Sequence, residues 1–146
     1  ENNPELLTLP SKNLIIAGAL LHDIAKTPCL NNECDHAEEG SKICIQLGFP
    51  EIAEIVKEHV RLLSYAEDRY QKGIFLAKDI IFYADKRVNH SSVVDLQERL
   101  AYILEKYGNN DPSRCKIIRE NFKKCQNLEK WICLKAECSP ADFTNI

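Results

Sequence analysis

The sequence predicts an all-α protein, a single-domain helical bundle of about six helices spanning residues 1–146. Three observations favour this class. Nearly every segment carries apolar residues at helical spacing, and no strand-like alternation bounded by hairpin turns is found. The length of 146 residues, with 45% hydrophobic and 28% charged side chains, is typical of one folded globular domain.

Capping and turn residues delimit the helices of the first half. Residues 14–25 are apolar all round apart from one polar pair, which is typical of a helix in the middle of a bundle. Asp35, followed by Glu38 three residues later, forms a capping box and predicts a helix over 35–47 that Gly48 ends. Pro50 then starts a third helix whose apolar stripe runs past residue 59.

The second half repeats the same pattern after a polar connection at residues 65–73. Apolar periodicity predicts helices over 74–88 and from the Ser92 region to residue 107. Asp111 as the N-cap and Pro112 at the first helical position predict the last helix, over about 112–136. We therefore expect one helical domain without repeats.

Charge and hydropathy exclude several classes of partner. The net charge of −3 gives no electrostatic reason to expect nucleic acid. No apolar run is long enough to span a bilayer, and no secretory signal is visible, so we expect a cytoplasmic protein without a membrane partner.

The seven cysteines are an odd number and form no C-x-x-C motif. Several fall in helical patterns, where a cysteine behaves as a small buried hydrophobe, so a reducing compartment fits better than a disulfide framework. Cys29, Cys34 and His36 lie close in sequence, but three ligands are too few for a closed zinc site.

Ionisable residues lie on faces that periodicity assigns to the interior. His22 and Asp23 interrupt the apolar helix 14–25, His59 shares a stripe with Ile55, and Asp85 follows Ile81 by one turn. Each alone is compatible with a hydrogen-bonded core residue. A lone Asp85, for example, is also explained by a salt bridge to Arg61 or Arg99. Together they favour a divalent cation that neutralises the carboxylates and binds the imidazoles.

Four segments, in order, resemble the HD superfamily of metal-dependent phosphohydrolases. They are ALLHDIAK at 19–26, DHAEEG at 35–40, KEHV at 57–60 and YADKR at 83–87. The resemblance covers about residues 14–107, and it implies a helical bundle of the HD type.

The resemblance also implies the roles of the predicted ligands. His22, Asp23 and Asp85 would bind the principal metal, and Asp23 would bridge to a second ion held by His36 and His59. One or two divalent ions are expected, and this ligand set suits manganese, iron, cobalt, nickel or magnesium.

The implied activity is hydrolysis of a phosphomonoester or phosphoanhydride by metal-activated water, with a small phosphorylated molecule, such as a nucleotide, as substrate. Asp23 and Lys26 would be catalytic. Lys26, Arg61 and Arg87 would contact the substrate phosphate. Lys26 has a second interpretation, as a cation that stabilises the end of a helix.

One departure from the family pattern concerns its first histidine, which belongs to a helix before the His22–Asp23 pair. Residues 1–21 contain no histidine, and the sequence begins with Glu1 and lacks methionine, so we expect that first family helix to be missing. The alternatives are a non-catalytic module that binds metal or a phosphorylated ligand, and a helical scaffold without metal. His90 is a poor replacement because its place beside a turn predicts exposure.

Overall fold

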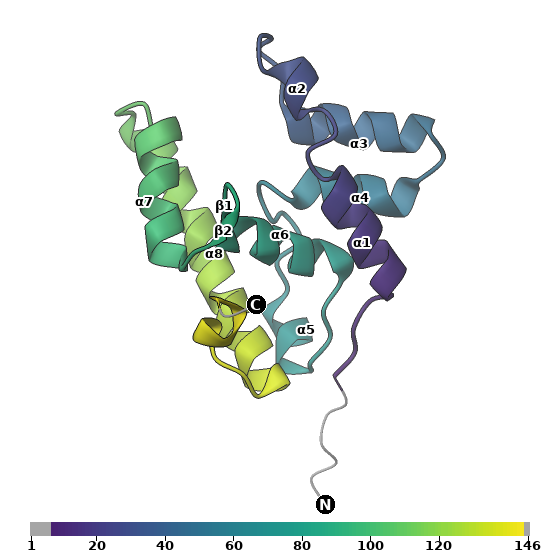
Figure 1. Cartoon of the computed structure of the whole chain (residues 1–146), viewed down its shortest axis with the longest axis vertical. Helices are drawn as coiled ribbons and strands as arrows, with labels where there is room; N and C mark the ends of the chain where they lie inside the picture. Colours follow the sequence, from purple (N-terminus) through teal and green to yellow (C-terminus); the bar gives the residue numbers. More distant parts are fainter. Residues whose placement is uncertain (1–6, 145–146) are drawn as a thin grey trace, which may run out of the picture. The chain divides into compact units, whose positions relative to one another are not determined.

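The computed structural model describes residues 7–144 and is built almost entirely of helices (Figure 1). The predicted all-α class is confirmed. The elements are α1 Lys12–Leu21, α2 Lys26–Cys29, α3 His36–Gln46, α4 Pro50–Glu58, α5 Glu67–Gln71, α6 Ala77–Arg87, β1 Val88–Asn89, β2 Ser92–Val93, α7 Leu96–Tyr107, α8 Pro112–Ala136 and the 3₁₀ turn η1 Pro140–Thr144.

The chain divides into two compact units, which we call the N-terminal and the C-terminal unit. The N-terminal unit contains Thr8–Ser64 and Phe75–Phe82. The C-terminal unit contains the described residues 7, 65–74 and 83–144. Helix α6 contributes its first half to one unit and its second half to the other. The predicted single domain over 1–146 stays a prediction.

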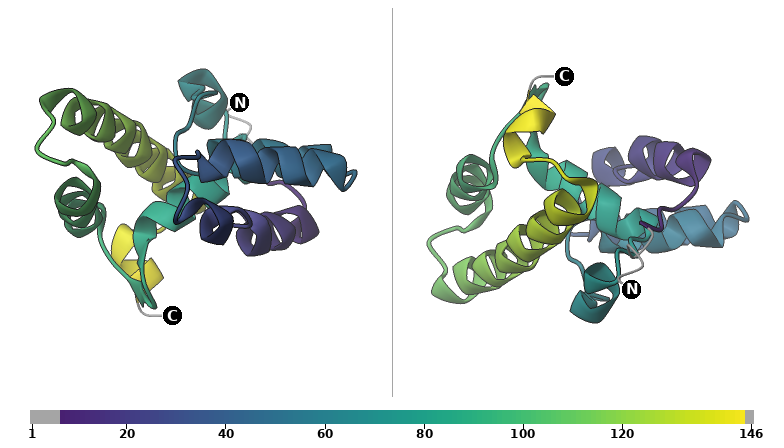
Figure 2. Two further views of the ribbon diagram at one scale, coloured as in Figure 1. Left: turned by 90° about the horizontal axis from the view of Figure 1, so that it is seen from above. Right: turned by 90° about the horizontal axis from the view of Figure 1, so that it is seen from below.

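In the N-terminal unit, helices α3 and α4 pack side by side (Figure 1, Figure 2) and share a cluster of buried residues. Val56 of α4 is fully buried against Cys44 of α3. Gly40 permits the close approach, since a Cβ atom there would lie 2.7 Å from Val56 Cγ1. Helix α1 packs on α4 in a similar way through Gly18.

In the C-terminal unit, α7 packs along the long helix α8. Asp111 accepts hydrogen bonds from the first backbone amides of α8, at 2.8 Å from Ser113 N, as its predicted N-cap role requires. A two-stranded hairpin, with Val88 paired to Val93, is an addition to the predicted fold. His90 adopts a positive φ of 55° in its turn, and this conformation reverses the chain within a few residues.

Four predicted segments differ from the structure. The helix expected from the Ser92 region begins at Leu96, because Ser92 and Val93 form β2 and Asp95 is the N-cap. The helix expected over 14–25 ends at Leu21, and a turn leads to the short helix α2. The polar connection 65–73 contains helix α5. The helix expected from residue 74 begins at Ala77, because the carboxylate of Asp79 accepts a 2.7 Å hydrogen bond from Leu76 N just before the helix.

The expectation of fully reduced cysteines is corrected at one pair. Cys29 and Cys34 form a disulfide, because the loop between α2 and α3 brings their Cα atoms to 5.4 Å. The other five cysteines are free thiols. Over residues 7–144, none of the helices combines the length and apolarity that a bilayer-spanning segment needs.

Candidate metal centre

Two of the predicted ligands follow the end of helix α1. His22 continues the helical hydrogen-bond pattern, with its amide 2.9 Å from Gly18 O, and Asp23 comes directly after it in the turn. Their side chains are 24% and 31% exposed, so both remain open to a ligand from solvent. The pair therefore lies at a helix end, outside the helix interior that the apolar pattern predicted.

Two further histidines lie at the ends of the packed helices α3 and α4. His36 is the first residue of α3, after the N-cap Asp35, and His59 directly follows the last residue of α4. His59 is almost completely buried. The packing of α3 on α4 brings the Nε2 atoms of His36 and His59 to 3.2 Å.

The carboxylate of Asp23 lies between these groups, and its two oxygens face different partners. Oδ1 lies 3.4 Å from Nε2 of His36 and 3.4 Å from Nε2 of His59. Oδ2 lies 3.6 Å from Nε2 of His22 and accepts a 2.6 Å hydrogen bond from Lys26 Nζ. Each oxygen thus has its own set of neighbours.

Backbone carbonyls orient two of the imidazoles. Nδ1 of His22 lies 2.8 Å from Ala19 O, and Nδ1 of His59 lies 2.6 Å from Val56 O. A carbonyl oxygen only accepts, so Nδ1 carries the proton in both rings. In the neutral ring the lone pair is then on Nε2, the atom that faces Asp23, as in histidines that bind metals.

The electrostatics favour an ionised carboxylate at Asp23. Its partial burial acts to raise the pKa, but the facing imidazoles of His36 and His59 and the ammonium group of Lys26 outweigh burial and hold the pKa well below its usual range. The group is therefore an anion at neutral pH, which is the state that binds a cation.

The donor set fits a divalent metal ion. Asp23, His36 and His59 each offer a ligand atom, and these atoms lie within 4.8 Å of one another. Because Nδ1 of His59 carries the proton, its Nε2 can only accept. The 3.2 Å approach of the two Nε2 atoms is therefore a hydrogen bond only if His36 carries its proton on Nε2. A shared cation satisfies both lone pairs, and imidazole with carboxylate suits first-row divalent metals.

Comparison with known proteins identifies the family of this chain. The HD domain family model matches residues 5–98. The chain belongs to the HD-domain family. A curated relative, a tRNA (cytidine(56)-2'-O)-methyltransferase from Picrophilus torridus, is 28% identical over 109 residues, which cover 68% of this chain. The match spans only 30% of that relative's length. No solved structure matches the chain.

The remaining predicted ligand of the HD domain, Asp85, lies in the second half of α6, in the C-terminal unit. Its side chain is 23% exposed, and Oδ2 accepts a 2.8 Å hydrogen bond from Lys86 Nζ. Its predicted role beside His22 and Asp23 stays a prediction. His90 lies exposed in the hairpin turn, as its sequence context indicates.

The predicted substrate contact of Arg87 stays a prediction, and in the structure its side chain is 5% exposed and engaged within the C-terminal unit. Its nitrogens donate to Val94 O at 2.7 Å, Tyr83 Oη at 2.7 Å, Glu129 Oε2 at 2.9 Å and Pro140 O at 2.9 Å. Burial, together with the Glu129 carboxylate, raises the pKa of Tyr83. Arg61, in contrast, is exposed after α4, and its predicted phosphate contact stays a prediction.

Sequence reasoning missed Glu58, which holds the loop after His59. Its buried carboxylate accepts hydrogen bonds from Leu63 N at 2.9 Å, from Ser64 N at 2.8 Å and from Lys78 Nζ at 2.9 Å. The signal was a glutamate in the last turn of an amphipathic helix, which also fits a solvated face. Its partner on α6 is 20 residues away, too far for a local pattern to reveal.

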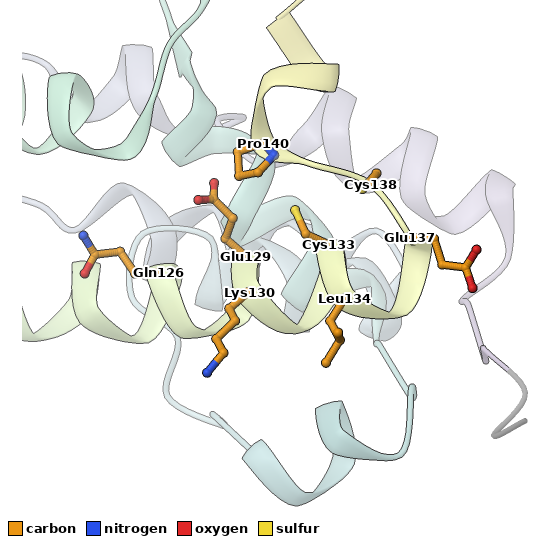
Figure 3. A pocket seen from close by; sticks show the side chains of 8 residues that line it. All are labelled: Gln126, Glu129, Lys130, Cys133, Leu134, Glu137, Cys138 and Pro140. Atoms are coloured by element: carbon orange, nitrogen blue, oxygen red, sulfur yellow. The ribbon is translucent and has the colours of Figure 1, made fainter. Parts of the chain in front are cut away.

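The structure also contains a pocket at the C-terminal part of α8 (Figure 3). It is lined by Gln126, Glu129, Lys130, Cys133, Leu134, Glu137, Cys138 and Pro140. None of the ligands or basic residues predicted from sequence is among them. We therefore assign no role in phosphate chemistry to this pocket.

Proposed function

We propose that this HD domain is a metal-dependent phosphohydrolase that cleaves a phosphomonoester or phosphoanhydride of a nucleotide. The observation that carries the proposal is the division of the Asp23 carboxylate. Oδ1 faces His36 and His59, whereas Oδ2 faces His22. A carboxylate with histidines at both oxygens is suited to bridge two cations, which supports a dinuclear site.

Metal ions held by Asp23 and the histidines would supply an activated water and would neutralise charge on the phosphoryl oxygens. Backbone and side-chain groups of the protein provide the rest. The carbonyls of Ala19 and Val56 fix the ring orientation of His22 and His59, and the depressed pKa of Asp23 keeps it anionic. Lys26, with a side chain 54% exposed, presents an ammonium group at the solvent side of the cluster, where it would meet a phosphate oxygen.

The test combines metal analysis with phosphate release from a panel of nucleotides. Asp23→Ala is expected to remove bound metal and activity together. Glu54→Gln is the matched control, because Glu54 is a carboxylate of the same unit that is 74% exposed. Retained phosphate release by Asp23→Ala, with the control unchanged, would refute the proposal.

The division of ligands is tested separately. His36→Ala is expected to lower the metal content from two ions to one, since His36 approaches only Oδ1 of the bridging carboxylate. If this variant loses all metal, the two-site assignment is wrong. The identity of the ion, among manganese, iron, cobalt, nickel and magnesium, is decided by the same analysis.

A non-catalytic HD module that binds metal is the second candidate, because the ligand atoms of Asp23, His36 and His59 fit a cation but do not by themselves require turnover. Such a module would retain stoichiometric metal and release no phosphate from any substrate. The panel should include tRNA, because the matched relative is named for an activity on tRNA. We nevertheless propose a small nucleotide, since the net charge is −3.

A further inference from the structure

The disulfide Cys29–Cys34 connects helix α2, which begins with Lys26, to the loop just before helix α3, which begins with His36. Cys29 is the last residue of α2, which starts with Lys26. Cys34 lies two residues before the start of α3 at His36. Cys34 is exposed and Cys29 is half-buried, so a reductant can reach the bond from solvent.

The two connected elements differ in how firmly they are held. Helix α2 has four residues, none of them buried, and its N-terminus has no side-chain cap. A single turn of this kind is not stable by itself, because nucleation costs more than its few hydrogen bonds return. Helix α3 has four buried residues and is capped by Asp35. The disulfide therefore ties a weakly held turn to the residue that precedes the N-cap of a firmly packed helix.

We propose that Cys29–Cys34 is a reducible tether that positions Lys26 for the substrate phosphate, an inference that rests on the proposed function. In the disulfide form, Lys26 Nζ lies 2.6 Å from Asp23 Oδ2, at the edge of the ligand cluster. Reduction releases α2 and with it the ammonium group. The packed helices α3 and α4 keep His36 and His59 in place, and His22 and Asp23 follow the end of α1, which packs on α4, so metal binding remains.

The redox step balances with a dithiol as the reductant. One thiolate of the dithiol attacks Sγ of exposed Cys34, the disulfide bond breaks, and the Cys29 thiolate leaves and takes up a proton. The second thiolate then attacks the mixed disulfide. It forms the cyclic disulfide of the reductant and releases Cys34 as a thiol, so two electrons and two protons reach the protein.

The size of the effect follows from loop closure. In the chain-entropy model, cross-linking a loop of about six residues favours the closed form by roughly 40-fold. We therefore expect the α2 amides to exchange up to about 40-fold faster after reduction. We expect the affinity for phosphate to fall by about tenfold, which is less than the roughly 40-fold effect of the cross-link. The informative amides are Cys29, which donates to Ala25 O at 3.1 Å, and Leu30, which donates to Thr27 O at 3.2 Å.

The first experiment uses the metal-free full chain and needs no activity. Thiol titration of the unfolded protein should give five free thiols in the oxidised form and seven after dithiothreitol. Hydrogen exchange should then accelerate at Cys29 and Leu30 and stay unchanged in α3. Seven thiols in aerobically purified protein, or equal exchange in both forms, would overturn the tether.

The second experiment measures the affinity of the metal-loaded protein for inorganic phosphate. Cys34→Ser is compared with wild type without reductant, because dithiols also bind metals. Cys138→Ser is the matched control. Cys133 and Cys138 are also separated by four residues, but both are free thiols, so this variant removes a thiol without breaking a disulfide. Weaker phosphate binding with unchanged metal content, in Cys34→Ser alone, supports the tether. Equal affinity in both variants overturns it. A protein that binds no metal in any form overturns the proposed function, and the exchange comparison still decides the tether.

Discussion

Replacement of Gly40 by alanine tests whether the close contact of α3 and α4 builds the metal centre. The new Cβ would lie 2.7 Å from Val56 Cγ1 and 3.2 Å from Ile24 Cγ2, closer than packed carbon atoms approach. Val56 is fully buried, so it has no free space into which to move. Overpacking of this kind costs about 1–3 kcal/mol, and the better helix propensity of alanine returns about 1 kcal/mol.

The expected net loss is therefore about 1 kcal/mol of unfolding free energy, or roughly 3 °C in Tm for a chain of this size. The larger effect should be on the site, since separation of α3 from α4 moves His36 away from His59, whose Nε2 atoms now lie 3.2 Å apart. Calorimetric titration with Mn²⁺ is expected to show weaker binding of the second ion by about tenfold, or about 1.4 kcal/mol.

Lys42→Ala is the control for this experiment, because Lys42 lies on the same helix and is 60% exposed. Its loss removes only a surface ion pair with Glu39, which solvent screens and which adds little to stability. Metal affinity should not change in the control. An unchanged metal titration in Gly40→Ala would show that the packing of α3 on α4 does not set the spacing of the histidines.

The other predictions concern charge and metal. Glu129→Ala should lower the unfolding free energy by about 3 kcal/mol in urea titrations, because it leaves the buried Arg87 guanidinium without its carboxylate, while metal content stays the same. Burial acts to raise the pKa of Glu58, but hydrogen bonds from Lys78 and Ser64 outweigh it and place the pKa below its ordinary value of 4.5. The stabilisation is therefore complete above pH 4.5 and is lost as the pH falls through the lower folded-state pKa, so melting curves should show an acid decline that Lys78→Met reduces. Removal of bound metal with a chelator should lower Tm, and metal added back should restore it, since the ion binds only the folded ligand set.

Signals that are local in sequence predicted much of the fold. Asp35 and Asp111 were predicted as N-caps, and both accept hydrogen bonds from the first amides of their helices. A cap depends on residues within one turn, so a single sequence is enough to find it. Asp23 and His59 could also be singled out, because polar residues on apolar stripes are costly unless they are bound or paired. His36 was expected only from the resemblance to the HD family.

Features that depend on distant partners were not predictable. Arg87 looked like a surface cation near the site, but its carboxylate partner Glu129 is 42 residues away on another helix. The pair of Glu58 and Lys78 shows the same limitation. In both cases tertiary packing decides whether the charged side chain is buried, and the neighbouring residues in the sequence do not indicate this burial.

The early end of helix α1 is the difference between expectation and structure that matters most for the chemistry. A helix continued through residue 25 would direct the Asp23 amide to Ala19 O and so compete for the acceptor that orients His22. Because α1 ends at Leu21, Ala19 O is among the terminal carbonyls that lack a helical partner, and His22 Nδ1 approaches it at 2.8 Å. His59, which lies just past the end of α4, uses the carbonyl oxygen of Val56 in the same way, three residues before it. In both histidines, which directly follow a helix, Nδ1 donates its proton to a backbone carbonyl, and Nε2 remains as the ligand atom.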